Sequence, residues 1–138
     1  MAYIDVTVPF DGEDFLSGRP GDPVRAAIEE HGGLWPVPAA EEFAGQGLTD
    51  AHIARFLAKG TPHLGATLTA PAELKGSPGD VPATYVKCLL DRDVPPSAVA
   101  GPVEGGRWGP AELDTGHRPM FSQPREPARV LSESAAAD

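Results

Sequence analysis

Two residues of this 138-residue chain have the types and positions that acid–base chemistry requires. Asp91 directly follows residues 84–90, a nearly continuous apolar run that is typical of a buried strand. His117 follows a second, weaker strand pattern at residues 108–113. A carboxylate next to a histidine orients the imidazole and stabilises its protonated form, so that the imidazole can act as the general base for a nucleophile. The pair predicts base-assisted nucleophilic catalysis.

The stretch between the two residues has room for one helix and one strand, which predicts two parallel strands joined by a crossover. Carboxyl ends of parallel strands share one edge of the sheet, where α/β proteins bind their ligands. We therefore expect Asp91 and His117 on the same rim, within hydrogen-bonding or one-water reach. Asp93 is the alternative acid, and the position of Asp91 at the strand exit favours Asp91.

The other residues with reactive side chains have simpler structural interpretations. Cys88 lies inside the apolar run, which favours a small core residue over a nucleophile. Ser122 or Gln123 is expected to cap the terminal helix, and Ser122 is better placed as such a cap than as a nucleophile. The remaining histidines lack metal-ligand spacing and a nearby cysteine, so we expect surface positions for His31, His52 and His63. The sequence predicts no metal and no cofactor.

A third strand is predicted at residues 2–8, which are rich in β-branched and aromatic types and end before Pro9. Between it and residues 84–90, frequent Gly and Pro predict short helices with irregular connections. The predicted helices are 22–31, 39–44 and, most clearly, 50–59, which Thr49 caps and Gly60 ends. The predicted fold class is α/β, with about three parallel strands, flanking helices and a small helical cap.

The length fits a single domain. We expect residues 1–16 and 81–131 to form the core with its partial sheet, and residues 17–80 to form a helical cap inserted into it. A terminal helix is predicted at residues 124–131, followed by a frayed tail at 132–138.

The charge of the chain disfavours two classes of partner. Its 11 basic and 20 acidic residues give a formal net charge of −9, which disfavours nucleic acid and anionic membrane surfaces. The sequence shows neither a signal-peptide pattern nor a run of about 20 apolar residues. With one cysteine, it can form no internal disulfide. We expect a soluble, cytoplasmic protein.

Three segments resemble small α/β-hydrolase esterases, in particular plant-type methyl esterases and hydroxynitrile lyases and their bacterial counterparts. Residues 82–95, Pro-Ala-Thr-Tyr-Val-Lys-Cys-Leu-Leu-Asp-Arg-Asp-Val-Pro, resemble the family's acid-bearing strand and turn. Residues 112–124, Glu-Leu-Asp-Thr-Gly-His-Arg-Pro-Met-Phe-Ser-Gln-Pro, resemble its histidine loop and following helix. Residues 3–13 resemble its sixth strand and the start of its cap. The resemblance implies that Asp91 and His117 are the acid and histidine of a Ser-Asp-His triad.

The family's nucleophile elbow, Gly-x-Ser-x-Gly, does not occur in this sequence. The nearest string, Gly-Ser-Pro-Gly at residues 76–79, is one residue too short and does not follow a strand. In the family, the elbow and the oxyanion-hole loop precede the strand that residues 2–8 resemble. The resemblance therefore implies an esterase fragment that is inactive as an isolated chain and hydrolyses small esters only if it is complemented.

Two alternatives to the esterase fragment stay open. One is a non-catalytic, hydrolase-like remnant that binds small molecules or a protein partner. The other is a self-sufficient enzyme of a different type that uses Asp91 and His117. The expected partner is a polypeptide carrying the missing N-terminal half, or a second copy of this chain. Either would pair with the strand at 2–8, whose edge carries only Asp5 as a charge.

Overall fold

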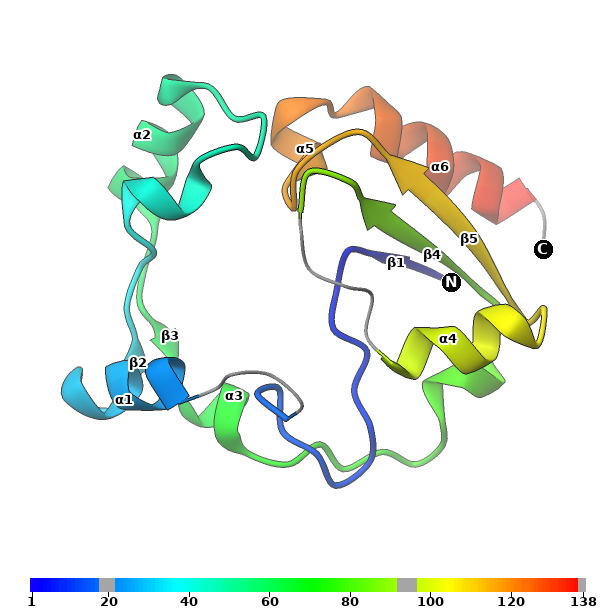
Figure 1. Cartoon of the computed structure of the whole chain (residues 1–138), viewed down its shortest axis with the longest axis horizontal. Helices are drawn as coiled ribbons and strands as arrows, with labels where there is room; N and C mark the ends of the chain where they lie inside the picture. The colour runs from blue at the N-terminus through cyan, green and yellow to red at the C-terminus, as the bar shows by residue number, and fades with distance from the viewer. Residues whose placement is uncertain (18–21, 92–96, 137–138) are drawn as a thin grey trace.

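The computed structural model describes residues 1–17, 22–91 and 97–136. Its elements form two groups (Figure 1). One group is built on a three-stranded sheet, and the other is a cap of short helices and a two-stranded ribbon between the first and second strands of that sheet. This mixed α/β architecture is the one predicted from the sequence.

The sheet contains β1 (Ala2–Ile4), β4 (Ala83–Cys88) and β5 (Trp108–Leu113) in the order β1-β4-β5. Both pairs are parallel, which confirms the three predicted parallel strands. In the register, Ile4 lies opposite Val86, and Cys88 lies opposite Leu113. The carboxyl ends of all three strands consequently lie at one edge of the sheet.

Strand β1 is shorter than the strand predicted at residues 2–8. It ends at Ile4 because Asp5 adopts a φ of 48°, in the left-handed region, and turns the chain away from the sheet. The Asp5 N–H makes a last bond to the Val86 carbonyl at 2.8 Å. Val8 still lies in the core and packs with Tyr85. The apolar residues after Ile4 therefore indicated burial and not strand pairing.

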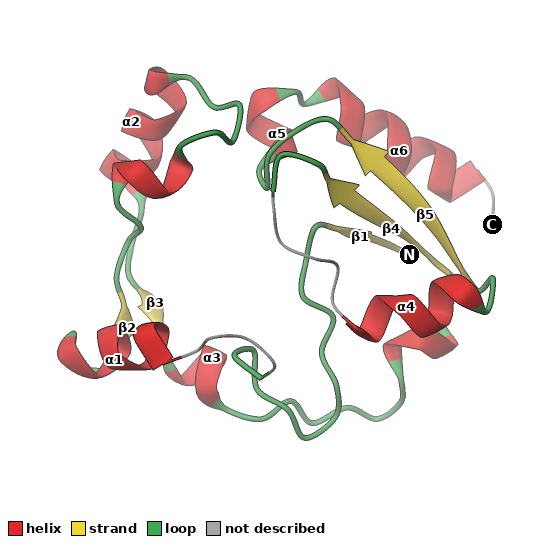
Figure 2. Cartoon of the chain, in the orientation of Figure 1, coloured by secondary structure: helices red, strands yellow, loops and turns green. Residues whose placement is uncertain are grey.

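Helices cover both faces of the sheet, because successive residues of β4 point to opposite sides. On one face, Tyr85 and Trp108 pack with Val99 of α4 (Ser97–Glu104). On the other, Val86 and Leu113 pack with Val130 of α6 (Arg125–Ala136). Figure 2 shows α4 and α6 on opposite sides of the strands.

The terminal helix is longer than predicted. A short helix, α5 (Pro119–Ser122), precedes it, and α6 continues to Ala136, past residue 132 where fraying was expected to begin. The Ser134 hydroxyl donates to Thr84 Oγ1 at 3.0 Å, which attaches the last turns of the helix to β4. This contact between segments distant in the sequence could not be read from the polar residues of the tail.

The cap contains the predicted helices in modified form. Helix α2 (Asp50–Lys59) is confirmed, and Thr49 Oγ1 accepts the N–H of His52 as its cap. The cap also holds α1 (Asp22–Glu30), η1 (Ala40–Phe43), α3 (Ala66–Thr69) and an antiparallel ribbon of β2 (Leu34–Trp35) with β3 (His63–Leu64). The segment predicted as a helix at 39–44 is the 3₁₀ helix η1. A second 3₁₀ turn, η2 (Pro78–Asp80), leads into β4.

None of the helices in the described part of the chain has the length and apolar character needed to cross a bilayer.

Candidate active site

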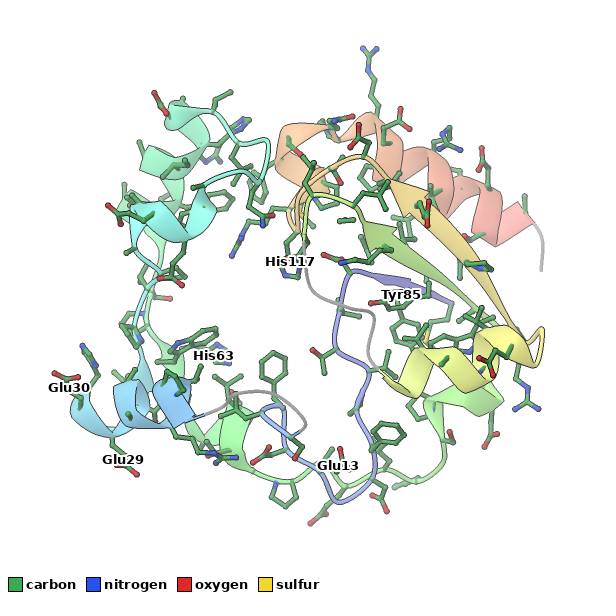
Figure 3. The ribbon with its side chains drawn as sticks, viewed as in Figure 1. Glu13, Glu29, Glu30, His63, Tyr85 and His117 are labelled. Carbon is green, nitrogen blue, oxygen red and sulfur yellow. The ribbon has the colours of Figure 1, made fainter. Side chains whose placement is uncertain are left out.

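Three ionisable side chains meet at the edge formed by the carboxyl ends of the strands. Asp5 follows β1, Asp91 follows β4 after a two-residue turn, and His117 lies in the loop after β5. His117 Nδ1 lies 3.0 Å from Asp5 Oδ2 and 3.4 Å from Asp91 Oδ2. Figure 3 shows the His117 side chain beside the end of β1.

The predicted proximity of Asp91 and His117 is confirmed, since the two side chains lie within an ion-pair distance on the same rim. The alternative acid, Asp93, lies outside the described residues. The catalytic roles assigned to Asp91 and His117 stay predictions.

Asp5 is the site residue that sequence reasoning missed, and it lies closer to His117 than Asp91 does. The strand was predicted to reach residue 8, which placed Asp5 in its middle rather than at its end. A signal was nevertheless present: Asp5 is the one charged residue in the apolar run 2–8. In a parallel sheet the carboxyl ends of neighbouring strands share one edge, so an acid at the end of β1 lies near the residues that follow β4.

Asp5 is a buried carboxylate held from several directions, and its side chain is only 3% exposed. Its Oδ1 accepts a hydrogen bond from the Lys87 ammonium at 2.9 Å and another from the Cys88 N–H at 3.1 Å. Burial acts to raise the pKa of Asp5, but hydrogen bonds with His117, Asp91, Lys87 and Cys88 outweigh it and hold that pKa well below its usual range. Asp5 is therefore ionised at neutral pH, and the bond with His117 must be donated by the Nδ1–H.

The left-handed backbone of Asp5 aims this carboxylate at the end of β4. Asp tolerates such a conformation better than most residues, at a cost of roughly 1 kcal/mol or more. Among the described residues, Asp5 is the one non-glycine with a positive φ. Local strain of this kind concentrates at functional sites.

The cap contacts the loop that carries His117. The backbone N–H of His117 donates to Gln46 Oε1 at 2.6 Å. The guanidinium of Arg118 stacks over the Phe43 ring, 4.8 Å from its centroid, and Phe121 packs edge-on against Phe56. The imidazole ring is held at Nδ1 by Asp5. Its side chain is 45% exposed, so the rest of the ring is accessible from solvent.

The two serines considered in the sequence analysis are not placed as nucleophiles. The Ser122 hydroxyl is buried and has no hydrogen-bond partner among the described residues, so it does not cap α6. Gln123, the other expected cap, closes the turn at the start of α6 through its backbone, because its carbonyl accepts the N–H of Glu126. The Ser77 hydroxyl accepts the N–H of Gly79 in the turn η2.

Cys88 is completely buried in β4, as predicted for a core residue. Burial raises the pKa of its thiol, which keeps it protonated and unreactive.

The other histidines make local contacts outside the site. His31 Nδ1 lies 2.8 Å from the Ala27 carbonyl, and His63 Nε2 lies 2.7 Å from Thr67 Oγ1. His52 Nδ1 accepts the N–H of Thr49 and completes the cap of α2. Figure 3 shows His63 on the cap, apart from His117.

Asp5, Asp91 and His117 also form the one group in the described residues whose ligand atoms could surround a metal ion, with those atoms within 4.8 Å of one another. Two observations favour a hydrogen-bonded arrangement instead. The Lys87 ammonium already balances the Asp5 charge, and His117 Nδ1 is engaged by Asp5 directly. The donor set therefore fits an acid–histidine pair better than a cation site.

No protein-family model and no curated protein matches the chain. A crystal structure of the pyrethroid hydrolase PytH with BIF is similar, with a TM-score of 0.52 and 18% sequence identity. The match covers 96% of this chain and 58% of that chain, so this sequence spans little more than half the length of the hydrolase. At this identity the likeness shows the fold alone: the chain has a partial α/β-hydrolase fold. It supports the hydrolase-like part of the resemblance, and not the finer similarity to plant-type methyl esterases and hydroxynitrile lyases.

Proposed function

We propose that this chain supplies the acid and histidine of a carboxylic ester hydrolase. The observation that carries the proposal is the bond of 3.0 Å between His117 Nδ1 and the buried, ionised Asp5, with Asp91 at 3.4 Å, at the carboxyl edge of a parallel sheet. An α/β-hydrolase fold holds its acid and histidine at this edge.

The roles follow from the protonation states. With the Nδ1–H donated to Asp5, the other ring nitrogen, Nε2, carries a free electron pair and can act as a general base. It accepts the proton of a serine hydroxyl while the serine attacks the ester carbonyl, and the imidazolium then donates that proton to the leaving alcohol. The ionised Asp5 accepts the Nδ1–H and stabilises the imidazolium during this step. Asp91, the acid that the family resemblance implies, lies 3.4 Å from the same nitrogen and is hydrogen-bonded to Asp5.

The nucleophile must come from outside these 138 residues, because no Gly-x-Ser-x-Gly occurs in them. We propose that it is supplied by further sequence, either on the same polypeptide or on another one. That sequence also provides the backbone N–H groups that stabilise the oxyanion.

The sheet offers a place for this complementary part. Strand β1 is at the edge of the sheet, and no strand of the described residues pairs with its outer side. A parallel strand of the complementary part can extend the sheet there through main-chain hydrogen bonds. Pairing of two copies of this chain through the same edge is the competing arrangement.

The missing elbow also favours a second candidate, a non-catalytic module that binds small molecules or proteins. One assay separates the two. The purified chain is given p-nitrophenyl acetate alone, and then together with a polypeptide that carries the first part of the fold, including the elbow. We expect the chain alone not to exceed the rate of free imidazole, and the mixture to turn over.

No turnover from a mixture that forms a stable complex would favour the binding module. Robust hydrolysis by the chain alone, lost in Ser77→Ala or Ser122→Ala, would overturn the proposal.

A further inference from the structure

The contact between Gln46 and the His117 loop is built from both sides. On the cap side, Gln46 lies between Gly45 and Gly47, with φ values of 76° and 70°. Glycine adopts this left-handed conformation without strain, whereas other residues do so at a cost. The Gln46 N–H closes the turn 43–46 by donating to the Phe43 carbonyl at 3.3 Å. The turn presents the Gln46 side chain to the loop after β5.

On the sheet side, Gly116 allows the close approach. A Cβ at this position would overlap the backbone and side-chain oxygens of Gln46 and lie 2.7 Å from its Cα. The φ of Gly116 is not left-handed, so space rather than conformation requires glycine here. Immediately after it, the His117 N–H donates to Gln46 Oε1 at 2.6 Å.

We infer that Gln46 is a positioning residue for His117. The histidine is then held at two ends: its backbone N–H by the cap, and its ring Nδ1 by Asp5 and Asp91. The inference deepens the proposed function and rests on it for the role of His117. Its consequence is that the cap fixes the orientation of the general base.

The orientation of the ring depends on this backbone bond because His117 is itself exposed, although Thr115 and Gly116 just before it are buried. Residues 116–117 follow the last ladder pair of β5, and the N–H of His117 finds its acceptor in the cap rather than in the sheet. Without an acceptor, the peptide unit before His117 can rotate toward water. Rotation of this unit moves the Cα–Cβ bond that aims the imidazole at Asp5.

The test is NMR of the full chain, without a nucleophile or substrate. Gln46→Met keeps the length of the side chain and removes its acceptor. We expect the hydrogen-exchange protection of the His117 amide to fall about fivefold, as for one lost hydrogen bond. We also expect the downfield signal of the Nδ1 proton bound to Asp5 to broaden or disappear. Gln46→Glu keeps an oxygen acceptor at the same reach and should retain both signals.

Glu41→Met is the matched control, because Glu41 is an exposed residue of η1 in the same part of the cap. It should change neither signal. Two outcomes would overturn the inference: an unchanged His117 amide and Nδ1 proton in Gln46→Met, or a loss in Gln46→Glu equal to that in Gln46→Met. If Gln46→Met does not fold, Gln46→Asn, whose amide ends one methylene short of His117, gives the same readout. Neither signal requires ester turnover, so failure here is distinguishable from failure of the proposed function.

Discussion

At the residue scale, the site depends on one buried charge that the sequence did not reveal. Asp91 and His117 could be predicted because each follows a recognisable strand in a parallel arrangement. Asp5 was missed because the left-handed backbone that ends β1 early is not visible in an apolar, β-branched segment, although its lone charge in that segment was a signal. Its pairing with Lys87 and the Cys88 amide comes from a strand far away in the sequence.

The Asp5 charge should be important for stability. Asp5→Asn leaves the Lys87 ammonium, 16% exposed, without its counter-charge, and we expect the free energy of unfolding to fall by about 3 kcal/mol. Urea unfolding measures the change. Asp114→Asn, an exposed aspartate in the loop before His117, is the control and should stay within about 0.5 kcal/mol of wild type. Equal effects of the two substitutions would contradict the account.

The pH dependence of stability should report the same carboxylate. The pKa of Asp5 is lowered in the folded chain and is about 3.9 in the unfolded chain, so the unfolded chain binds the proton first as the pH falls. The contribution of Asp5 is therefore complete above about pH 5 and is lost as the pH falls below about 4, toward the folded pKa. Unfolding curves between about pH 5 and 3 should show a steeper loss for wild type than for Asp5→Asn. Parallel curves would mean that Asp5 is not ionised in the folded chain.

At the element scale, the sequence predicted the helices and strands whose caps or composition are visible within the element itself. Helix α2 was recognisable from its cap at Thr49 and its end at Gly60, and β4 and β5 from their composition. The ribbon of β2 and β3 was not, because two-residue strands carry no periodicity and depend on tertiary contacts. The extension of α6 to Ala136 likewise depends on a contact with β4.

The junction of cap and sheet should tolerate no side chain at Gly116. Gly116→Ala places a methyl group against the backbone of Gln46, which cannot move as freely as a side chain. We expect a loss of about 1–3 kcal/mol in the free energy of unfolding, measured with urea. Gly109→Ala in β5, where a Cβ meets nothing within 4 Å, is the matched control and should change stability by no more than about 0.5 kcal/mol. A neutral Gly116→Ala would show that cap and loop are not in close contact.

At the scale of the whole molecule, the chain presents an open sheet. The order β1-β4-β5 leaves the outer side of β1 without a partner strand in the described residues, and the matched hydrolase is considerably longer than this chain. Natural sheets protect such edges with charges, proline or bulges. The fold class could be predicted from sequence because it depends on strand order and crossovers. The sequence could not predict an occupant of this edge, because no strand of the described residues pairs with the outer side of β1.

The open edge should make the isolated chain self-associate. The Met1 carbonyl and the Asp5 N–H form hydrogen bonds with β4. Because backbone groups of successive residues in a strand point to opposite sides, the N–H of Ala2 points away from β4, toward the open edge. Ala2→Pro removes this donor at an edge position, where proline is tolerated, and should shift the chain toward monomer in sedimentation velocity. A wild-type chain that is a stable monomer, with protected amides throughout residues 2–8, would show that the edge is covered by this chain itself.

The most direct test of the central claim is the kcat/KM of the chain assembled with its complementary part, compared between His117→Ala and His31→Ala. Both substitutions remove an imidazole, but only His117 is held by Asp5 and Asp91, whereas His31 bonds to the Ala27 carbonyl in the cap. We predict a loss of at least about a thousandfold for His117→Ala and no significant loss for His31→Ala. Ester turnover that survives His117→Ala would contradict the assignment of His117 as the general base.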